Sequence, residues 1–528
     1  MTLQQNPTHP TGLEKTGANL EAITEEIVIA TEARPANTSA TCTGGDRDDW
    51  QKYFADAPDK TLERRQIEMD SRDRYERLCA RFASTLATLI CSLVLFAVSA
   101  SAATYTVNSK DDLDDGACNA AHCSLREAIN AANANAGFDF IVFNLDTFNI
   151  SSGVGTIVLT DELPAITGAV TIDGYTQKPC ANNPAPCSKQ NTQAAANDAV
   201  LLVELNGAAI ADSGADGLVI DAPGCLIRGL VINRFPSNGM SITSSAAGTV
   251  IAGNWIGLNA GGFFHQPNLE EGVYISNASN ITIGGTTPAA RNVISGNDIG
   301  GFGVYIAGAA ASGNKIQGNF IGTGKLGQTE AGNSNGVFIG GQAHGTTIGG
   351  TVAGAGNVIS GNEEYGLYID NAYNNQIQGN FIGLNASGNS ERPNGSSGIL
   401  LRNNSITNTI GGTTAAARNV ISGNGNVGIE IENSGNNLIE GNYIGTNAAG
   451  DDDIGNAGAG ILISGNSTSN KIGDSAAGAG NVISGNGREG VLLLGNTSAT
   501  LVLRNFIGTK ADGIGNLGNG KDGIFIRD

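Results

Sequence analysis

Charged side chains recur at equivalent points of a short pattern that repeats through the C-terminal half of the chain. The pattern is a tetrad of glycine, an apolar residue, any residue and a second apolar residue. The outward-facing positions of the tetrad strands in three consecutive coils include Asp370, Arg402, Glu430 and Glu432. A carboxylate beside an arginine could bind a uronate or act as a general acid or base. Because the signs alternate along the stack, the same residues could instead form an ion ladder without a chemical role, and we favour this interpretation.

A row of aromatic residues occupies the outward position in four consecutive tetrads. Its members are Tyr274, Tyr305, Phe338 and Tyr368. Such a stripe could bind sugar rings or a partner. Alternatively, the neighbouring rings pack on one another beneath a covering loop, and the pattern alone favours this second interpretation.

Oxygen ligands for Ca²⁺ are available in two acidic clusters. One is the run 451–453, and the other comprises four aspartates near the start of the repeats: Asp111, Asp112, Asp114 and Asp115. Calcium loops usually show spaced acids with a glycine turn, so three aspartates in a row favour a solvated loop tip. His122, His265 and His344 are scattered along the sequence, and this distribution predicts no transition-metal site.

Nucleophilic catalysis and nucleic-acid binding receive no support from the sequence. There is no Gly-x-Ser-x-Gly elbow, and Cys225 has no obvious partner base. With 49 acidic and 29 basic residues the net charge is −20, whereas phosphate binding needs clustered lysine and arginine. We therefore predict no nucleic-acid partner and no cofactor, with Ca²⁺ as the one ion that the acidic clusters could bind.

The elements that must position these side chains follow from the repeat itself. The tetrad recurs nine times between 272 and 526, at intervals of 30 to 33 residues, and two further tetrads begin at 217 and 239. Two more strand-like runs separate successive tetrads, so each repeat holds three strands of about four residues. Strands this short cannot form a stable sheet by themselves.

Such short strands become stable when successive coils of the chain stack, because each strand then pairs with its equivalent in the next coil. We predict an all-β parallel β-helix with three short strands per coil, about 31 residues per coil and about ten or more coils. The first and third residues after each tetrad glycine, such as Val273 and Ile275, should face inward. Asn319, Asn380 and Asn442 at the bends should stack into hydrogen-bonded ladders.

A short amphipathic segment precedes the coils. Ser124 and Glu127 form a capping box in the string CSLREAINAAN at 123–133. One helical face then carries the apolar residues Leu125, Ala128, Ile129 and Ala132. We expect a short helix here that closes the open end of the apolar column.

The stretch 115–133 resembles the CSLREA module of exported bacterial proteins, and the repeats resemble the right-handed parallel β-helix of the pectin-lyase-like superfamily. Together the resemblances cover roughly 103–528 and imply a secreted or surface β-helix. Lyases and hydrolases of that superfamily carry acidic residues, arginine and Ca²⁺ on the outer face of one sheet. The paired-aspartate strings and the Gly-His-Gly of the hydrolases are absent here, so their mechanism does not carry over.

Targeting signals precede the cap. The apolar run 86–98, followed by Ala100-Ser101-Ala102 and preceded by several arginines, is typical of a secretory signal peptide. At 13 residues it is too short to span a bilayer, although a membrane anchor is the alternative. We therefore divide the chain into a polar extension (1–68), a signal peptide (69–102), a cap (103–145) and a repeat domain (146–528). The extension is either a disordered leader or a gene-model artefact ahead of a start at Met69.

Cysteine spacing fits an exported protein. Cys118 and Cys123 are close in sequence, as are Cys180 and Cys187, and we predict that each pair forms a disulfide. Cys225 is left over and should be a buried small hydrophobe.

These observations predict a secreted or cell-surface β-helix without a transmembrane span in the mature chain. We expect a non-catalytic role in binding or adhesion, to carbohydrate or a surface matrix, because uniform repeats leave little room for a catalytic centre. A polysaccharide lyase or hydrolase is the alternative, so whether the chain is an enzyme stays open. The last tetrad, at 523–526, would leave apolar residues and a strand edge uncovered. This predicts either that the chain is truncated relative to a longer product or that it associates end to end with another chain.

Overall fold

The computed structural model describes residues 101–146, 152–177, 187–297 and 300–527. All of them belong to one compact unit, 99–528. The predicted extension at 1–68 and all but the last two residues of the predicted signal peptide lie outside the described residues.

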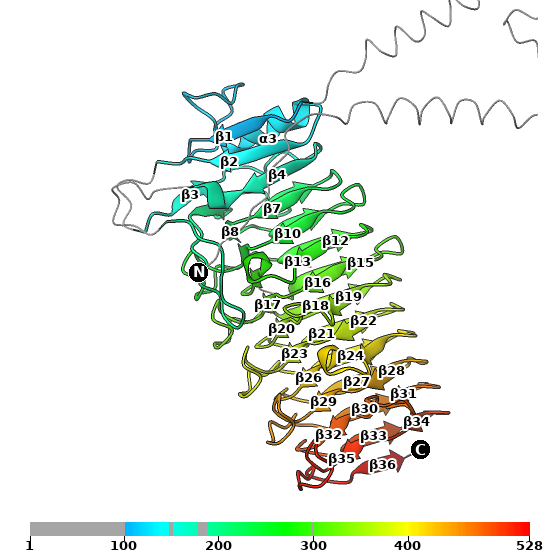
Figure 1. The fold of residues 1–528 in the computed structure, drawn as a ribbon. Coiled ribbons are helices and arrows are strands. Elements are labelled where there is room, and N and C mark those ends of the chain that lie inside the picture. Colours follow the sequence, from blue (N-terminus) through cyan, green and yellow to red (C-terminus); the bar gives the residue numbers. More distant parts are fainter. Residues whose placement is uncertain (1–100, 147–151, 178–186, 298–299, 528) are drawn as a thin grey trace, which may run out of the picture. The chain divides into compact units, whose positions relative to one another are not determined.

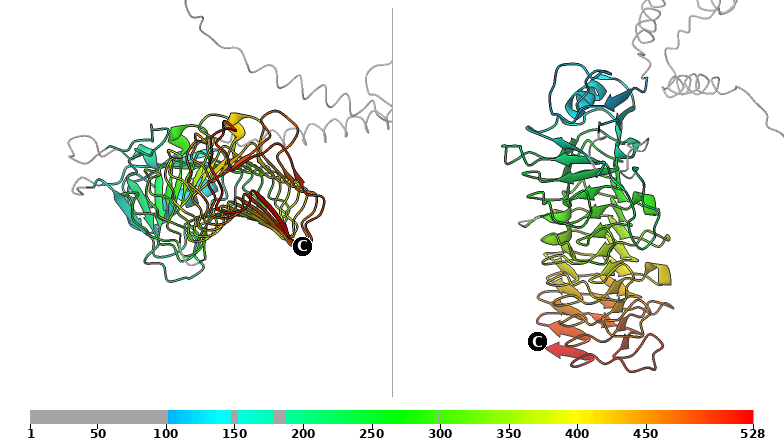
Figure 2. Two further views of the ribbon diagram at one scale, coloured as in Figure 1. Left: turned by 90° about the horizontal axis from the view of Figure 1, so that it is seen from below. Right: turned by 90° about the vertical axis from the view of Figure 1, so that its left-hand side faces the viewer.

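Three long parallel sheets, here named A, B and C, run along the coil (Figure 1). They contain 13, 12 and 11 strands, and each strand pairs in parallel with its equivalent in the next coil. Seen along the coil, the turns lie over one another (Figure 2). The predicted right-handed parallel β-helix is confirmed.

The bounds of the elements follow the repeat. Sheet A consists of β1 (Thr104–Val107), β2 (Asp139–Phe143), β4 (Val170–Asp173), β7 (Leu226–Arg228), β10 (Val250–Ala252), β13 (Thr282–Gly284), β16 (Lys315–Gln317), β19 (Thr347–Gly349), β22 (Gln376–Gln378), β25 (Thr409–Gly411), β28 (Leu438–Glu440), β31 (Lys471–Ile472) and β34 (Leu501–Val502). Sheet B consists of β3 (Gly155–Val158), β5 (Val203–Asn206), β8 (Leu230–Asn233), β11 (Trp255–Ile256), β14 (Val293–Ile294), β17 (Phe320–Ile321), β20 (Val358–Ile359), β23 (Phe381–Ile382), β26 (Val420–Ile421), β29 (Tyr443–Ile444), β32 (Val482–Ile483) and β35 (Phe506–Ile507). Sheet C consists of β6 (Leu218–Ile220), β9 (Met240–Ile242), β12 (Val273–Ser276), β15 (Phe302–Ala307), β18 (Asn335–Gly340), β21 (Leu367–Asp370), β24 (Ile399–Arg402), β27 (Ile429–Glu432), β30 (Ile461–Ser464), β33 (Val491–Leu494) and β36 (Ile524–Arg527). The helices within the described ranges are α3 (Leu125–Ala134) and the short 3₁₀ turns η2 (Gly174–Thr176), η3 (Pro288–Ala290) and η4 (Ala415–Ala417).

The inward-facing residues of the tetrads form the apolar core of the coil. Val273 and Ile275 of β12 pair in register with Val304 and Ile306 of β15, and all four side chains are fully buried. Equivalent residues of the other coils join them in one core cluster. Because each apolar residue lies over its equivalent, the core is a set of stacked rows and the inward positions are confirmed.

Buried asparagines form ladders on both sides of sheet B. The ladder that precedes its strands links Asn254, Asn292, Asn319, Asn357, Asn380, Asn419, Asn442, Asn481 and Asn505, with Nδ2–Oδ1 distances of 2.8 to 3.3 Å. The ladder that follows them links Asn268, Asn297, Asn333, Asn362, Asn394, Asn424, Asn456, Asn486 and Asn519. The predicted ladder is therefore confirmed, and a second one accompanies it.

The ladders also explain why most strands of sheet B are shorter than predicted. From β11 onward the strands of sheet B have two residues instead of four, because the flanking asparagines turn inward and interrupt the alternation. At the bend before β17 the left-handed conformation belongs to Gly318, with φ of 69°, and not to Asn319. A Cβ on Gly318 would lie 2.3 Å from the carbonyl oxygen of Gly285, so only glycine fits there.

The predicted capping helix is confirmed as α3. Its N-cap Ser124 accepts a hydrogen bond from the backbone N–H of Glu127, and the Glu127 carboxylate accepts one in return from the backbone N–H of Ser124. The four predicted apolar residues are buried, and the helix packs against β1 and β2. Both strands extend sheet A into the cap.

The cysteines agree with the prediction where they are described. Cys118 and Cys123 form a disulfide, and Cys225 is buried and free. Cys187 is disulfide-bonded as well, but its predicted partner Cys180 lies outside the described residues, so that pairing stays a prediction.

The last described strand, β36, pairs with β33 on one side. Its Ile524 and Ile526 side chains are 45% and 68% exposed. The self-association predicted for this edge stays a prediction. In the described part of the chain, no helix is both long and apolar enough to cross a membrane.

Candidate functional site

The aromatic row lies on the outward face of sheet C, one ring per strand. Tyr274, Tyr305, Phe338 and Tyr368 pair in register, and all four side chains are partly exposed. Successive ring centroids lie 5.3, 4.4 and 5.2 Å apart. The rings therefore pack on one another, as the second interpretation predicted, and they still reach the surface.

The two ends of the row differ. At the C-terminal end the Arg402 guanidinium lies 4.9 Å from the centroid of the Tyr368 ring and covers it. At the N-terminal end Tyr274 stacks on Tyr305 with an interplanar angle of 28°, and its register partner on the other side is Ser241. A serine is too small to cover a phenol ring. Tyr274 therefore keeps one ring face free of a stacking partner.

A pocket of about 390 Å³ lies beside this ring. It is lined by Asp216, Val219, Asn238, Ser241, Ile242, Thr243, Ser244, Tyr274, Ser276 and Asn277. An aromatic face thus borders a set of small polar side chains from β9, β12 and the turns next to them. This arrangement suits a ligand with an apolar face and hydroxyl groups on its rim.

Asp216 is the main acceptor in the pocket. Its Oδ1 accepts hydrogen bonds of 2.9 Å from both the backbone N–H and the Nδ2 group of Asn238, while Ser241 Oγ donates to its Oδ2. These bonds hold the carboxylate in place. Because each carboxylate oxygen has two lone pairs, Oδ2 can accept a further hydrogen bond from a ligand.

Sequence reasoning missed these polar residues, although a signal for them exists. Asp216, Asn238 and Glu271 each stand directly before the glycine of a tetrad, in three consecutive coils. The next three coils place Phe302, Asn335 and Tyr365 at the same position, and the two rings among them contact the aromatic row. Aligning the residue before each glycine would have revealed this second column.

Glu271 is the most perturbed carboxyl of this face. Burial raises its pKa to about 7, and the nearby Glu270 and Asp216 carboxylates add to the shift. Burial, together with Tyr274 and Glu271, also raises the pKa of Tyr305. A carboxyl that keeps a protonated fraction near neutral pH can donate a hydrogen bond or act as a general acid.

Replacing Glu271 by glutamine should change how stability depends on pH. Because the folded-state pKa is raised above 4.5 to about 7, the native chain loses stability as the pH rises between these values. The variant should match the native chain at pH 4.5 and exceed it at pH 8 by roughly 1–2 kcal/mol, less than the full shift implies because the carboxyl is partly exposed. Thermal melts at both pH values measure this. Glu364→Gln, at an exposed position, is the control. If the stability difference between Glu271→Gln and the native chain were the same at both pH values, Glu271 would not be the group with the raised pKa.

Of the charged residues singled out in the sequence, Asp370 and Arg402 form an ion pair. Arg402 Nε lies 3.2 Å from Asp370 Oδ2, and Arg402 pairs in register with Glu432 on its other side. The Tyr368 hydroxyl donates to Asp370 at 2.9 Å. Glu430 takes no part in this ion pair and instead accepts a hydrogen bond from Ser397 Oγ at 2.7 Å. The Arg402 guanidinium is thus shared between carboxylates and the Tyr368 ring, which leaves it a poor site for a uronate.

The acidic clusters do not gather around one point. Near the cap, Asp112 pairs with Arg126, and Asp114 accepts a hydrogen bond from Asn130. In the run 451–453, Asp451 accepts one from Asn447. Neither cluster therefore assembles the oxygen ligands of a calcium loop from its aspartates alone.

Although the histidines are scattered along the sequence, His122 lies beside three carboxylates. Its Nε2 lies 3.1 Å from Asp111 Oδ1, and its Nδ1 lies 3.1 Å from Glu127 Oε2. The hydrogen bond to Asp111 chiefly raises the pKa of His122. Ligand atoms of Asp115, His122 and Glu127 lie within 4.8 Å of one another and could hold a divalent cation. The sequence did not show this because the loop before the cap helix folds back on itself.

Comparison with known proteins gives likenesses in fold alone. No family model and no curated protein matches the sequence. Among solved structures, the periplasmic alginate epimerase AlgG covers 72% of this chain and 78% of its own, at 16% identity and a TM-score of 0.31. The A-module of mannuronan C-5 epimerase AlgE6 from Azotobacter vinelandii covers 80% and 99%, at 13% identity and a TM-score of 0.33. Pectate lyase Pel9A covers 78% and 79%, at 14% identity and a TM-score of 0.28.

These values support no inference about substrate or reaction. The three stacked sheets themselves define the chain as a right-handed parallel β-helix protein. Function must therefore be argued from the residues of the site.

Proposed function

We propose that the protein is an exported β-helix that binds an uncharged polysaccharide along the outward face of sheet C. One sugar ring stacks on Tyr274. The observation that carries the proposal is the free ring face of Tyr274, which ends a row of aromatic rings and borders a polar pocket.

Sugar chemistry matches the two halves of this pocket. The C–H face of a pyranose is apolar and packs on an aromatic ring, while its hydroxyl groups need polar partners. Asp216 can accept a hydrogen bond from a sugar hydroxyl, and the side chains of Asn238 and Thr243 line the same pocket. The aromatic row beyond Tyr274 offers partly exposed ring edges to the following sugar units.

Charge favours an uncharged ligand over a uronate polymer. Asp216, Glu270 and Glu271 lie near the pocket, and the chain as a whole carries a net charge of −20. Arg402, a cation of this face, pairs with Asp370 and covers the Tyr368 ring. An acidic polysaccharide would meet like charges here, and like-charge contacts oppose binding.

A second candidate is glycoside hydrolysis at the same pocket. One observation favours it, namely the raised pKa of Glu271 close to Asp216. Glycosidases use a pair of carboxyl groups, one of which has a raised pKa and acts as the general acid. We retain binding as the main proposal because the rest of the face repeats from coil to coil.

Export is the third component of the proposal. It is supported by the resemblance of 115–133 to the CSLREA module, by the signal-like run at 86–98 and by the Cys118–Cys123 disulfide, a bond found mainly in oxidising compartments. N-terminal sequencing of protein secreted by the native host should begin at or near Ala103. Intact chain that remains inside the cell would contradict export.

Affinity electrophoresis tests the function. The full chain should be retarded in gels that contain at least one member of a panel of uncharged plant, algal and bacterial polysaccharides. It should migrate normally in gels with polygalacturonate or alginate. Retardation by the acidic polymers alone, or by none of the panel, would overturn the proposal. Release of new reducing ends from a retained polysaccharide would favour the hydrolase.

A further inference from the structure

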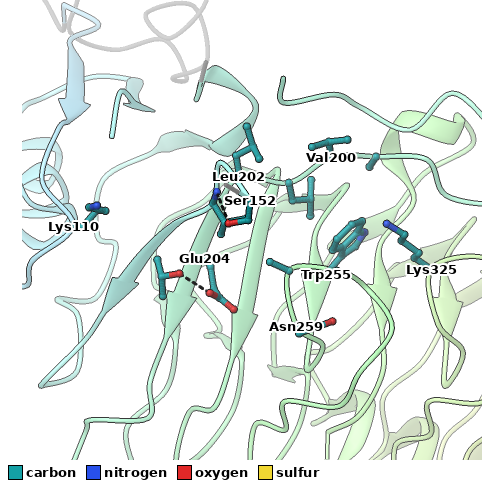
Figure 3. Close-up of a pocket in the computed structure, with 14 residues that line it drawn as sticks. Lys110, Ser152, Val200, Leu202, Glu204, Trp255, Asn259 and Lys325 are labelled. Carbon is teal, nitrogen blue, oxygen red and sulfur yellow. Dashed lines mark hydrogen bonds between the residues drawn. The ribbon is translucent and has the colours of Figure 1, made fainter. Parts of the chain in front are cut away.

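A larger cavity opens on a different face, beside the first strands of sheet B (Figure 3). Its volume is about 650 Å³. Val200, Leu202 and Ala260 form apolar walls, and Lys110 and Lys325 bring two positive charges to it. In a chain with a net charge of −20, two lysines that line one cavity and belong to none of the ion pairs of the described residues call for an explanation.

Lys325 has aromatic neighbours where an ion-pair partner would be expected. Its Nζ lies 4.9 Å from the centroid of the Trp255 ring and 4.9 Å from that of Phe263. None of the ion pairs found within the described residues includes Lys325 or Lys110. Burial alone lowers the pKa of Lys325, which is the direction expected for an ammonium that lacks a counter-charge.

Unpaired donors accompany this charge. Trp255 is 1% exposed, and its buried Nε1–H finds no acceptor in the described part of the chain. Asn259 uses its Oδ1 to accept from the backbone N–H groups of Phe263 and Phe264, which leaves its Nδ2 donors for another group. Buried donors are normally paired, so the cavity lacks an acceptor.

The one acidic residue that lines the cavity does not fill this role. Glu204 accepts hydrogen bonds from Thr156 Oγ1 at 2.7 Å and from Asn233 Nδ2 at 2.9 Å. These hydrogen bonds hold the Glu204 carboxylate against the strands of sheet B, away from Lys110 and Lys325 (Figure 3). The missing acceptor must therefore come from outside the described residues.

We propose that this cavity binds a small organic carboxylate. The carboxylate lies beside the Lys325 ammonium and accepts from the Trp255 indole N–H or from Asn259 Nδ2. The rest of the molecule packs on Val200, Leu202 and Ala260. Lys110 supplies long-range attraction from the other wall. The site lies on sheet B, so it does not depend on the glycan site of sheet C.

Tryptophan fluorescence can test this site because the chain has only two tryptophans. In the full chain with Trp50→Phe, Trp255 is the sole reporter. Titration with hexanoate should give a saturable change in its emission. Hexan-1-ol, which has the same apolar body without the charge, should bind at least tenfold more weakly. No saturation with hexanoate, or equal binding of the alcohol, would overturn the proposal.

Two lysine variants locate the binding. Lys325→Met keeps most of the aliphatic stem and should weaken hexanoate binding at least tenfold, whereas Lys110→Met should weaken it about threefold. Lys315→Met, at an exposed position of β16, is the matched control and should bind as the parent does. Calorimetry of Trp255→Phe checks the indole N–H, with an expected loss of three- to tenfold. Unchanged affinity in Lys325→Met would contradict the site, and melting temperatures show whether each variant is folded.

Discussion

Replacing Tyr274 by alanine is expected to weaken polysaccharide binding at least tenfold. The substitution removes the ring whose outer face, toward Ser241, has no stacking partner among the described residues. Burying a sugar face on an aromatic ring contributes about 1.5 kcal/mol or more, which corresponds to a factor of ten or more in affinity. Tyr274→Phe keeps the ring and should retain binding within about threefold. Affinity electrophoresis or calorimetry with the polysaccharide found by the screen measures both effects.

Tyr365→Ala is the matched control for this experiment. Tyr365 is also partly exposed and contacts the aromatic row, at 5.5 Å from Tyr368. It does not line the pocket next to Tyr274. Binding in this variant should stay within about twofold of the native chain. An equal loss in the two alanine variants would show that the row acts as a whole and that Tyr274 has no special part.

Replacing Asn419 by alanine should cause the largest loss of stability. Its Nδ2 donates to Ile377 O at 2.7 Å and to Asn442 Oδ1 at 2.9 Å, and its Oδ1 accepts from the backbone N–H and the Nδ2 of Asn380. The side chain is fully buried, so alanine leaves donors and acceptors unpaired away from water. At about 1–3 kcal/mol for each buried unpaired group, we expect a loss of about 3–5 kcal/mol.

Denaturant unfolding measures this loss. Asn466→Ala is the control, because Asn466 is exposed and lies outside both ladders, and its effect should stay within about 0.5 kcal/mol. A small effect of Asn419→Ala would mean that water replaces the ladder bonds. The stacked asparagines would then contribute shape to the turns but little free energy.

The fold could be predicted from the sequence because every coil repeats the same physical requirement. An apolar residue such as Val273 must lie over its equivalent Val304, and Asn319 must find Asn357. The length of the strands in sheet B could not be read in the same way. There the apolar pair is flanked by asparagines, and their inward side chains end the strand after two residues.

The site was only half predictable. The aromatic row follows from the tetrad, but whether Tyr274 has a free face depends on Ser241 in an earlier and less regular coil. The pocket also needs Asp216 and Asn238, which meet through the stacking of turns that differ in sequence. The cavity of sheet B joins residues as distant as Lys110 and Lys325, and no local pattern links them.

A crystal structure of the full chain with an oligosaccharide from the retained polysaccharide tests the central claim most directly. The account predicts one sugar ring on the face of Tyr274 that is turned toward Ser241, with a hydroxyl group within hydrogen-bond distance of an Asp216 carboxylate oxygen. It also predicts that the chain of sugars continues along the outward face of sheet C. An oligosaccharide bound on sheet A or sheet B, with the Tyr274 pocket empty, would contradict it.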